Sequence, residues 1–272
     1  MRRAVHAGIT NQEAAMLHSA RNLKGFAVVA TDGSIGKIDD VYFDDEKWVI
    51  RYVVVDTGGW LTGRKVLLSP MSFRDADWQG RKMMVNLTRD RVRNSPGIDT
   101  HKPVSRRQEG ALYEYYGYPY YWSGPYAWGY AAMPAVTEQE VFDSPERQHT
   151  REAMEQTSDE DMHLRSCADV TGYAIHATDD TLGHVDDFLF DEQDWSIRLV
   201  LVDPRDWWPN KDVMVPPERI VHVNWEDGTV DVNMSRAEIE SSPEYDPDHP
   251  PPSTLQEARA HRPHEGDQQP RL

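Results

Sequence analysis

The chain contains the same sequence twice, and this duplication constrains its fold more than any other feature. Displacing the sequence by 147 residues aligns residues 17–96 with residues 164–243 without a gap, and 27 of these 80 positions are identical. The identities include short shared runs, such as Ala30-Thr31-Asp32 against Ala177-Thr178-Asp179. An ungapped internal repeat of this length indicates one supersecondary unit built twice. We therefore expect a single small fold at two places along the chain.

Each repeat reads as a series of short strands separated by turns. In the first repeat the expected strands are 25–30, 34–43, 48–56, 65–68 and 81–87, with a hairpin signal at Asp32-Gly33. Closely spaced strands and turns are typical of small antiparallel barrels. We therefore predict an all-β chain of two tandem small antiparallel β-barrels, with short flanking helices and an aromatic linker. One such helix is expected over about 10–20, where Thr10 begins a capping-box pattern. The apolar third strands predict that the following valines are buried: Val53, Val55, Val200 and Val202.

The repeat boundaries divide the chain into four parts. The predicted domains are a first barrel over 17–96, a linker over 97–163, a second barrel over 164–243 and a mobile Pro- and His-rich tail over 244–272. The linker is unusual because 8 of the 12 tyrosines lie within residues 113–130, among glycines and prolines that interrupt regular structure. Its remainder, from Glu138, is polar and acidic.

The charge is divided unequally between the repeats. The whole chain carries a net charge of −17, but residues 17–96 carry +3 and residues 164–243 carry −11. Such an acidic chain argues against a nucleic-acid partner, because a phosphate backbone requires a basic face. Drift of solvated surface residues is one explanation of the difference. The other is that the basic repeat contacts the acidic one, within the chain or between chains.

The N-terminus bears on the compartment, whereas the single cysteine is neutral about it. Met1-Arg2-Arg3 is not followed by an apolar run, so we expect no signal peptide and no membrane insertion. Cys167 is the only cysteine and therefore has no internal disulfide partner. The expected location is the cytoplasm.

Adjacent aspartates recur in the second expected strand of each repeat, at Asp39-Asp40 and Asp186-Asp187. Several carboxylate oxygens converging on one point would suit a divalent cation. Neighbouring side chains on a strand point to opposite faces, which disfavours that convergence. We expect outward-pointing carboxylates that pair with Lys or Arg or bond the backbone. Similarly, Arg51 and Arg198 are expected to pair with strand aspartates.

Motifs of known enzyme chemistry are absent from the sequence. There is no Ser/His/Asp order, phosphate-binding loop or dinucleotide fingerprint, and the histidines have no metal-ligand spacing. Cys167 has no base within sequence reach. We therefore predict no catalytic residue, no cofactor and no metal, and a protein that is not an enzyme.

Two strings carry a resemblance to a known family. They are residues 23–44, LKGFAVVATDGSIGKIDDVYFD, and residues 170–191, VTGYAIHATDDTLGHVDDFLFD. Both resemble the opening of a PRC-barrel domain. This family is named for the cytoplasmic domain of the photosynthetic reaction-centre H subunit, and it includes the C-terminal domain of a ribosome maturation factor. The resemblance implies a barrel fold that is shared by proteins without a common reaction.

Together these observations favour a non-enzymatic protein–protein interaction or scaffold module that self-associates, with a homodimer as the expected assembly. One alternative is an accessory subunit of a membrane or electron-transfer assembly, as in the reaction centre, and a weaker one is a divalent-metal-binding enzyme. The identity of a protein partner stays open. Aromatic residues in loops and in the linker are the candidate partner contacts. They are Trp60, Trp207, Trp208, Tyr115, Tyr116, Tyr118, Tyr120, Tyr121, Trp122 and Trp128.

Overall fold

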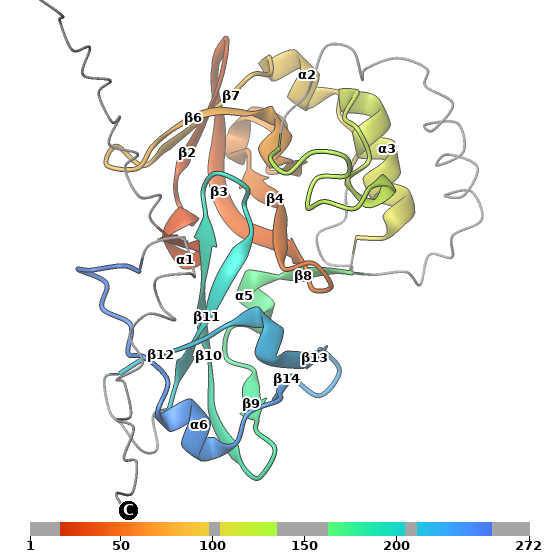
Figure 1. The fold of residues 1–272 in the computed structure, drawn as a ribbon. Coiled ribbons are helices and arrows are strands. Elements are labelled where there is room, and N and C mark those ends of the chain that lie inside the picture. The colour runs from red at the N-terminus through yellow and green to blue at the C-terminus, as the bar shows by residue number, and fades with distance from the viewer. Residues whose placement is uncertain (1–16, 98–103, 135–162, 205–210, 252–272) are drawn as a thin grey trace, which may run out of the picture.

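The computed structural model describes residues 17–97, 104–134, 163–204 and 211–251. These residues form a mostly β structure with two seven-stranded sheets, one for each repeat (Figure 1). The first repeat and the linker segment 104–134 lie at one end of the molecule, and the second repeat lies at the other.

The two sheets have the same strand order. The first runs β5-β4-β3-β2-β7-β6 and the second β12-β11-β10-β9-β14-β13. The first contains β2 (Ala27–Ala30), β3 (Gly33–Asp44), β4 (Val49–Asp56), β5 (Lys65–Leu68), β6 (Phe73–Asp77) and β7 (Lys82–Val85). The second contains β9 (Ala174–His176), β10 (Thr181–Asp191), β11 (Ile197–Asp203), β12 (Val213–Val215), β13 (Ile220–Asn224) and β14 (Thr229–Val232).

The two sheets share the register of strand pairing as well as the strand order. The pairing of Lys37 with Asp56 in β3–β4 recurs as His184 with Asp203 in β10–β11, and the bulges fall at matching positions. The expectation of one fold built twice is thus confirmed. Closed barrels are not confirmed, since in the described residues β5 and β6 end the first sheet without pairing with each other, as β12 and β13 do in the second.

The helices are short, and most begin at a Ser or Thr side chain that accepts a hydrogen bond from the first turn. The α-helices are α1 (Ala20–Leu23), α2 (Arg89–Arg93), α3 (Arg106–Tyr116), α5 (Cys167–Val170) and α6 (Arg236–Glu240). The 3-10 turns are η1 (Gly58–Leu61), η2 (Pro70–Ser72), η3 (Tyr121–Ser123) and η4 (Pro217–Arg219).

The prediction of a helix over 10–20 is wrong at its C-terminal end. Residues Leu17–Ser19 form the strand β1, and the helix α1 begins only after Ser19, whose side chain caps it. The first part of that prediction lies outside the described residues. Strand β6 was not expected either, because its residues are mostly charged and exposed rather than apolar.

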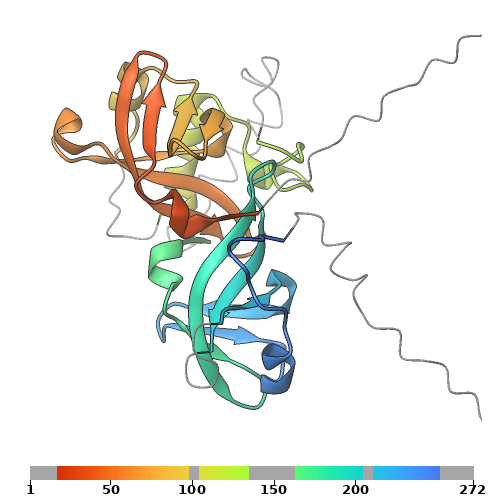
Figure 2. The same cartoon turned by 90° about the vertical axis from the view of Figure 1, so that its left-hand side faces the viewer.

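The repeats exchange their first strands. β1, from the first repeat, pairs with β10 of the second, and β8 (Leu164–Ser166), from the second repeat, pairs with β3 of the first. Figure 2 shows the long strand β10 running up from the second repeat to the first. The two sheets are therefore interlocked and not joined by a linker alone.

The core follows the apolar strands, as predicted. Val53, Val55, Val200 and Val202 are all buried. Gly36 and Gly183 occupy places where the partner strand leaves no room for a side chain. A Cβ at Gly36 would lie 2.1 Å from the carbonyl oxygen of Asp56, and a Cβ at Gly183 would lie 2.4 Å from the carbonyl oxygen of Asp203. These two glycines therefore permit the long strands to pack closely.

Candidate interaction surface

The contact between the repeats is built around the second aspartate of each Asp-Asp pair. Asp40 accepts hydrogen bonds from the Ser166 hydroxyl and, at 3.2 Å, from the Ala168 backbone N–H, both in the second repeat. Likewise, Asp187 of the second repeat accepts hydrogen bonds from the Ser19 hydroxyl and, at 3.0 Å, from the Arg21 backbone N–H, both in the first repeat. Each carboxylate thereby holds the start of the other repeat's first helix. Burial raises the pKa of both carboxyl groups.

The first aspartate of each pair forms ion pairs. Asp39 lies 2.7 Å from the Lys65 ammonium, whose hydrogen bond lowers the pKa of that carboxyl group, and Asp186 lies 2.6 Å from the Arg21 guanidinium. The expectation that these carboxylates bond the backbone or pair with Lys or Arg is confirmed, but the expectation that they point outward is wrong for Asp187, which is buried in the contact between the repeats. Within the described residues, no group of His, Cys, Asp or Glu side chains is arranged to hold a metal ion.

Further contacts across the junction join the basic repeat to the acidic one. Arg165 of the second repeat forms a 2.6 Å ion pair with Asp45 of the first. At the opposite side, the Trp78 ring stacks on His18 with ring centroids 3.6 Å apart, and its indole nitrogen donates to Glu192 at 2.5 Å. The two repeats thus contact each other directly within one chain, which is one of the two arrangements that the charge division predicted.

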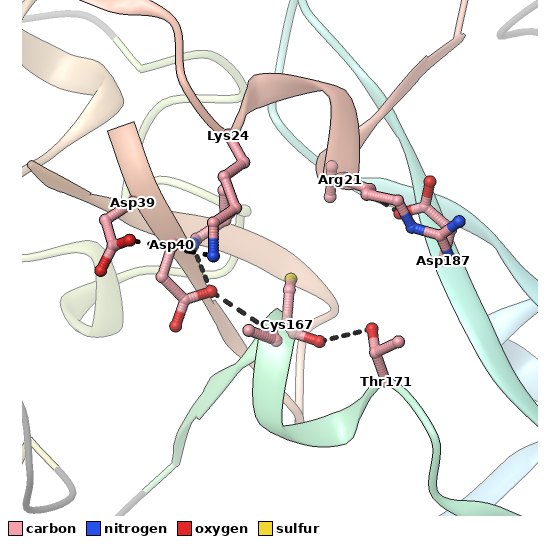
Figure 3. Close-up of a pocket in the computed structure, with 10 residues that line it drawn as sticks. Arg21, Lys24, Asp39, Asp40, Cys167, Thr171 and Asp187 are labelled. Carbon is pink, nitrogen blue, oxygen red and sulfur yellow. Dashed lines mark hydrogen bonds and ion pairs between the residues drawn. The ribbon is translucent and has the colours of Figure 1, made fainter. Parts of the chain in front are cut away.

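A cavity of about 220 Å³ lies between α1 and α5 at this junction (Figure 3). Its polar side chains are engaged by the contacts described above, and Lys24 lies 3.8 Å from Asp39. Burial raises the pKa of the Cys167 thiol well above its usual value, which keeps it protonated and a weak nucleophile. The thiol in this cavity is therefore not activated as a nucleophile.

The aromatic segment 104–134 covers the first repeat rather than connecting two separate bodies. Helix α3 lies beside β4 in Figure 1. Tyr113 of α3 packs against Tyr52 of β4, Tyr121 of η3 packs against Arg51 of β4, and Tyr113, Tyr121 and Trp128 are buried. The Trp128 indole nitrogen donates to the backbone carbonyl of Asp194 at 2.7 Å, which ties the segment to the second repeat. This segment thus contacts both repeats.

A buried polar network lies beneath the segment. The Glu109 carboxylate accepts hydrogen bonds from Tyr52 at 3.1 Å and Tyr121 at 2.8 Å, and pairs with Arg106 at 3.0 Å. Burial raises the pKa of Glu109 to about 7, although the positive charge of Arg106 and the tyrosine hydroxyls oppose that shift. The network fixes α3 against the sheet.

Arg51 is fully buried beside this network. Its guanidinium forms a 3.1 Å ion pair with Asp44 and lies 3.7 Å from the centre of the Tyr121 ring. It also donates to the backbone carbonyl of Ala127. In the second repeat Arg198 pairs with Asp191 at 3.4 Å, so the predicted pairing of both arginines with strand aspartates is confirmed.

The ten predicted contact residues differ in how far they are exposed on the surface. Trp207 and Trp208 lie outside the described residues. Trp60, Tyr115 and Trp122 are partly buried, and Trp60 lies beneath the guanidinium groups of Arg89 and Arg93. The remaining five are buried in the chain's own core: Tyr116, Tyr118, Tyr120, Tyr121 and Trp128. A partner that meets this fold without rearrangement therefore has access to only part of the predicted set.

Other aromatic-segment residues, which sequence reasoning missed, are exposed. Tyr126, Tyr130 and Met133 are 57%, 68% and 53% exposed, and we call them the exposed loop cluster. Backbone bridges between Tyr126 and Gly129 and between Trp128 and Ala131 hold the loop in a hairpin-like shape. The sequence did not distinguish these tyrosines from the buried ones because the segment has no regular period.

Comparison with known families gives a match to the PRC-barrel domain over residues 16–92. The resemblance noted in the sequence is thereby confirmed for the first repeat, whose strand order and register the second repeat shares. No curated protein matches the chain. Among the described residues, no helix combines the length and apolar character needed to cross a membrane.

Proposed function

We propose that this chain is a non-enzymatic scaffold that binds proteins, and that it binds a second copy of itself through the exposed loop cluster. The observation that carries the proposal is the exposure of Tyr126, Tyr130 and Met133 on a loop that is otherwise anchored by buried residues. Amphipathic aromatic side chains in a fixed position are typical of interface centres. The PRC-barrel match supports an interaction module, since such domains often act in protein interactions.

Charge favours a second copy as the occupant of this surface. The chain has no charged residue between Glu114 and Glu138, although it carries −17 overall. Two copies can meet at this stretch without bringing charged side chains of the segment together. Two-fold closure is the commonest symmetry of soluble oligomers, so we expect a dimer with the cluster at its axis.

The anchoring of the loop adds to the argument. Trp128 bonds Asp194 of the second repeat, and Arg51 bonds the carbonyl of Ala127, so the loop is held on both sides of the exposed tyrosines. A loop ordered before binding loses less conformational entropy when it docks. An accessory subunit of a membrane or electron-transfer assembly stays an alternative prediction.

Sedimentation velocity of the full chain over a wide concentration range tests the proposal. We expect a species of twice the 31.3 kDa monomer mass, which the double variant Tyr126→Ser/Tyr130→Ser converts to monomer. High salt should leave the dimer intact because its interface is uncharged. The control Val221→Ser removes an exposed apolar side chain elsewhere and should still dimerise. A wild-type monomer at every concentration, or a dimer indifferent to the double variant, would refute the proposal.

A further inference from the structure

Strands β6 and β13 each lie at one end of their sheet, and among the described residues the outer edge of neither pairs with another strand. The two edges differ in character. β6 pairs with β7 and β13 pairs with β14, and each lies at the end of the strand order in the described residues. The outer backbone groups of such a strand can bond another extended chain. The two edges are equivalent under the 147-residue shift, so β6 serves as an internal reference for β13.

The first repeat protects its edge with charge, and the second does not. β6 reads Phe-Arg-Asp-Ala-Asp, whereas β13 reads Ile-Val-His-Val-Asn. Both strands have a bulge at their second residue, where Arg74 of β6 is replaced by Val221 in β13. Val221 is 70% exposed. Charged side chains on an edge discourage pairing with other strands, and β13 lacks them.

A tryptophan follows each edge strand, and only one of the two is packed against the other repeat. Trp78 bonds Glu192 of the second repeat, and it stacks on His18, a first-repeat residue whose strand β1 pairs with β10. Its counterpart Trp225 is 50% exposed, and the position equivalent to His18 is held by Arg165, which is paired with Asp45. Val221 and Trp225 therefore leave apolar area beside an unpaired backbone edge.

The charges around β13 determine what kind of chain fits there. Glu218 precedes the strand, Glu226 and Asp227 follow it, and Asp231 lies on the neighbouring β14, while Arg219 is paired with Glu238. A second copy would bring together two repeats that each carry −11, which like-charge repulsion disfavours. A basic segment is attracted to the same surroundings.

We propose that β13 binds an extended, basic segment of a partner protein as an additional strand. Backbone hydrogen bonds to the outer edge of β13 supply affinity for any extended chain. An apolar side chain of the partner packs against Val221 and Trp225, and its Lys or Arg side chains face the acidic residues around the strand. This site is separate from the exposed loop cluster. A test that refutes the proposed self-association would therefore leave this proposal unaffected.

Hydrogen–deuterium exchange of the full chain with a synthetic peptide tests the proposal. The probe is a peptide of alternating Lys and Val residues. We expect it to slow amide exchange in Ile220–Asn224 and to leave Phe73–Asp77, the equivalent edge, unchanged. An otherwise identical peptide with alternate backbone nitrogens methylated keeps its charge but cannot form the ladder, and it should give no protection. A Glu/Val peptide should bind at least tenfold more weakly than the Lys/Val one.

Side-chain variants separate a specific edge site from general attraction to an acidic protein. Val221→Ser/Trp225→Ser keeps the charge and replaces side chains that are 70% and 50% exposed. We expect it to weaken peptide binding about tenfold, or about 1.4 kcal/mol. Tyr126→Ser/Tyr130→Ser is the matched control and should bind normally. Equal binding of the methylated peptide, or equal protection of β6 and β13, would overturn the proposal. Concentration-dependent protection of β13 without peptide would also overturn it, because it would identify a second copy as the occupant.

Discussion

Glu109 is the residue whose ionisation bears most directly on how the aromatic segment is held. Its carboxyl group is buried among Tyr52, Tyr121 and Arg106, and burial raises its pKa to about 7 from an ordinary value of 4.5. The folded protein therefore retains a proton that the unfolded chain releases near pH 4.5. Stability from this group is complete below that pH and is lost as the pH rises through about 7.

We predict that Glu109→Gln flattens the pH dependence of stability. Between about pH 5 and 7 the free energy of unfolding of the wild type should fall by up to about 1.4 kcal/mol per pH unit through this group. Asp40 and Asp187, whose pKa values are also raised by burial, contribute equally to both proteins and cancel in the comparison. Urea unfolding at several pH values measures the difference. Parallel profiles for the two proteins would show that Glu109 is ionised throughout.

At the scale of elements, the central feature is the exchange of β1–α1 and β8–α5 between the repeats. Each unit supplies a three-residue strand to the other repeat's sheet and directs a serine and a backbone N–H at an aspartate there. The recurrence of Asp-Asp in both repeats now has a structural explanation. The second aspartate accepts hydrogen bonds from the capping serine and a first-turn N–H of the other repeat's first helix, and the first aspartate pairs with a lysine or arginine.

Replacing the two members of one pair should have unequal effects. Asp187→Ala leaves the buried Ser19 hydroxyl and the Arg21 N–H without their acceptor, which we expect to cost about 1–3 kcal/mol of unfolding free energy. Asp186→Ala removes an ion pair whose arginine is half-exposed, and should cost less than about 1 kcal/mol. Asp187→Asn, which still offers an oxygen, serves as the intermediate control. Equal losses in chemical denaturation would contradict the assigned roles.

The sequence predicted most strands of each sheet and missed those whose pairing is determined by the other repeat. β4 is long and mostly apolar, and β3 is long and follows the Asp32-Gly33 hairpin signal, so local pattern suffices for them. β1 has three residues, Leu17–Ser19, and pairs with a strand about 170 residues away, which no local pattern reveals. Likewise, the segment around Tyr121 shows no period, and its burial follows from the polar network beneath it.

At the scale of the whole molecule, ion pairs join the two repeats within the chain in both directions, since Arg165 of the acidic repeat also pairs with Asp45 of the basic one. Arg21–Asp186 joins a basic residue of the first repeat to an acidic one of the second, and Trp128 of the aromatic segment bonds the second repeat at Asp194. The sequence predicted that the two repeats contact each other with aromatic residues nearby. It did not predict the exchange of β1 and β8 between the sheets. Each sheet contains one strand from the other repeat, so neither repeat alone contains all the strands of its sheet.

The central claim is that the interlocked repeats form one cooperative unit. Native-state hydrogen exchange at increasing urea tests it most directly, by comparing the slowest amides of β4 in the first repeat with those of β11 in the second. We predict that both sets exchange with the same free energy and the same urea dependence, because opening either sheet removes a strand from the other. If one repeat exchanged at a clearly lower free energy while the other stayed protected, the repeats would be independent domains and the account would be wrong.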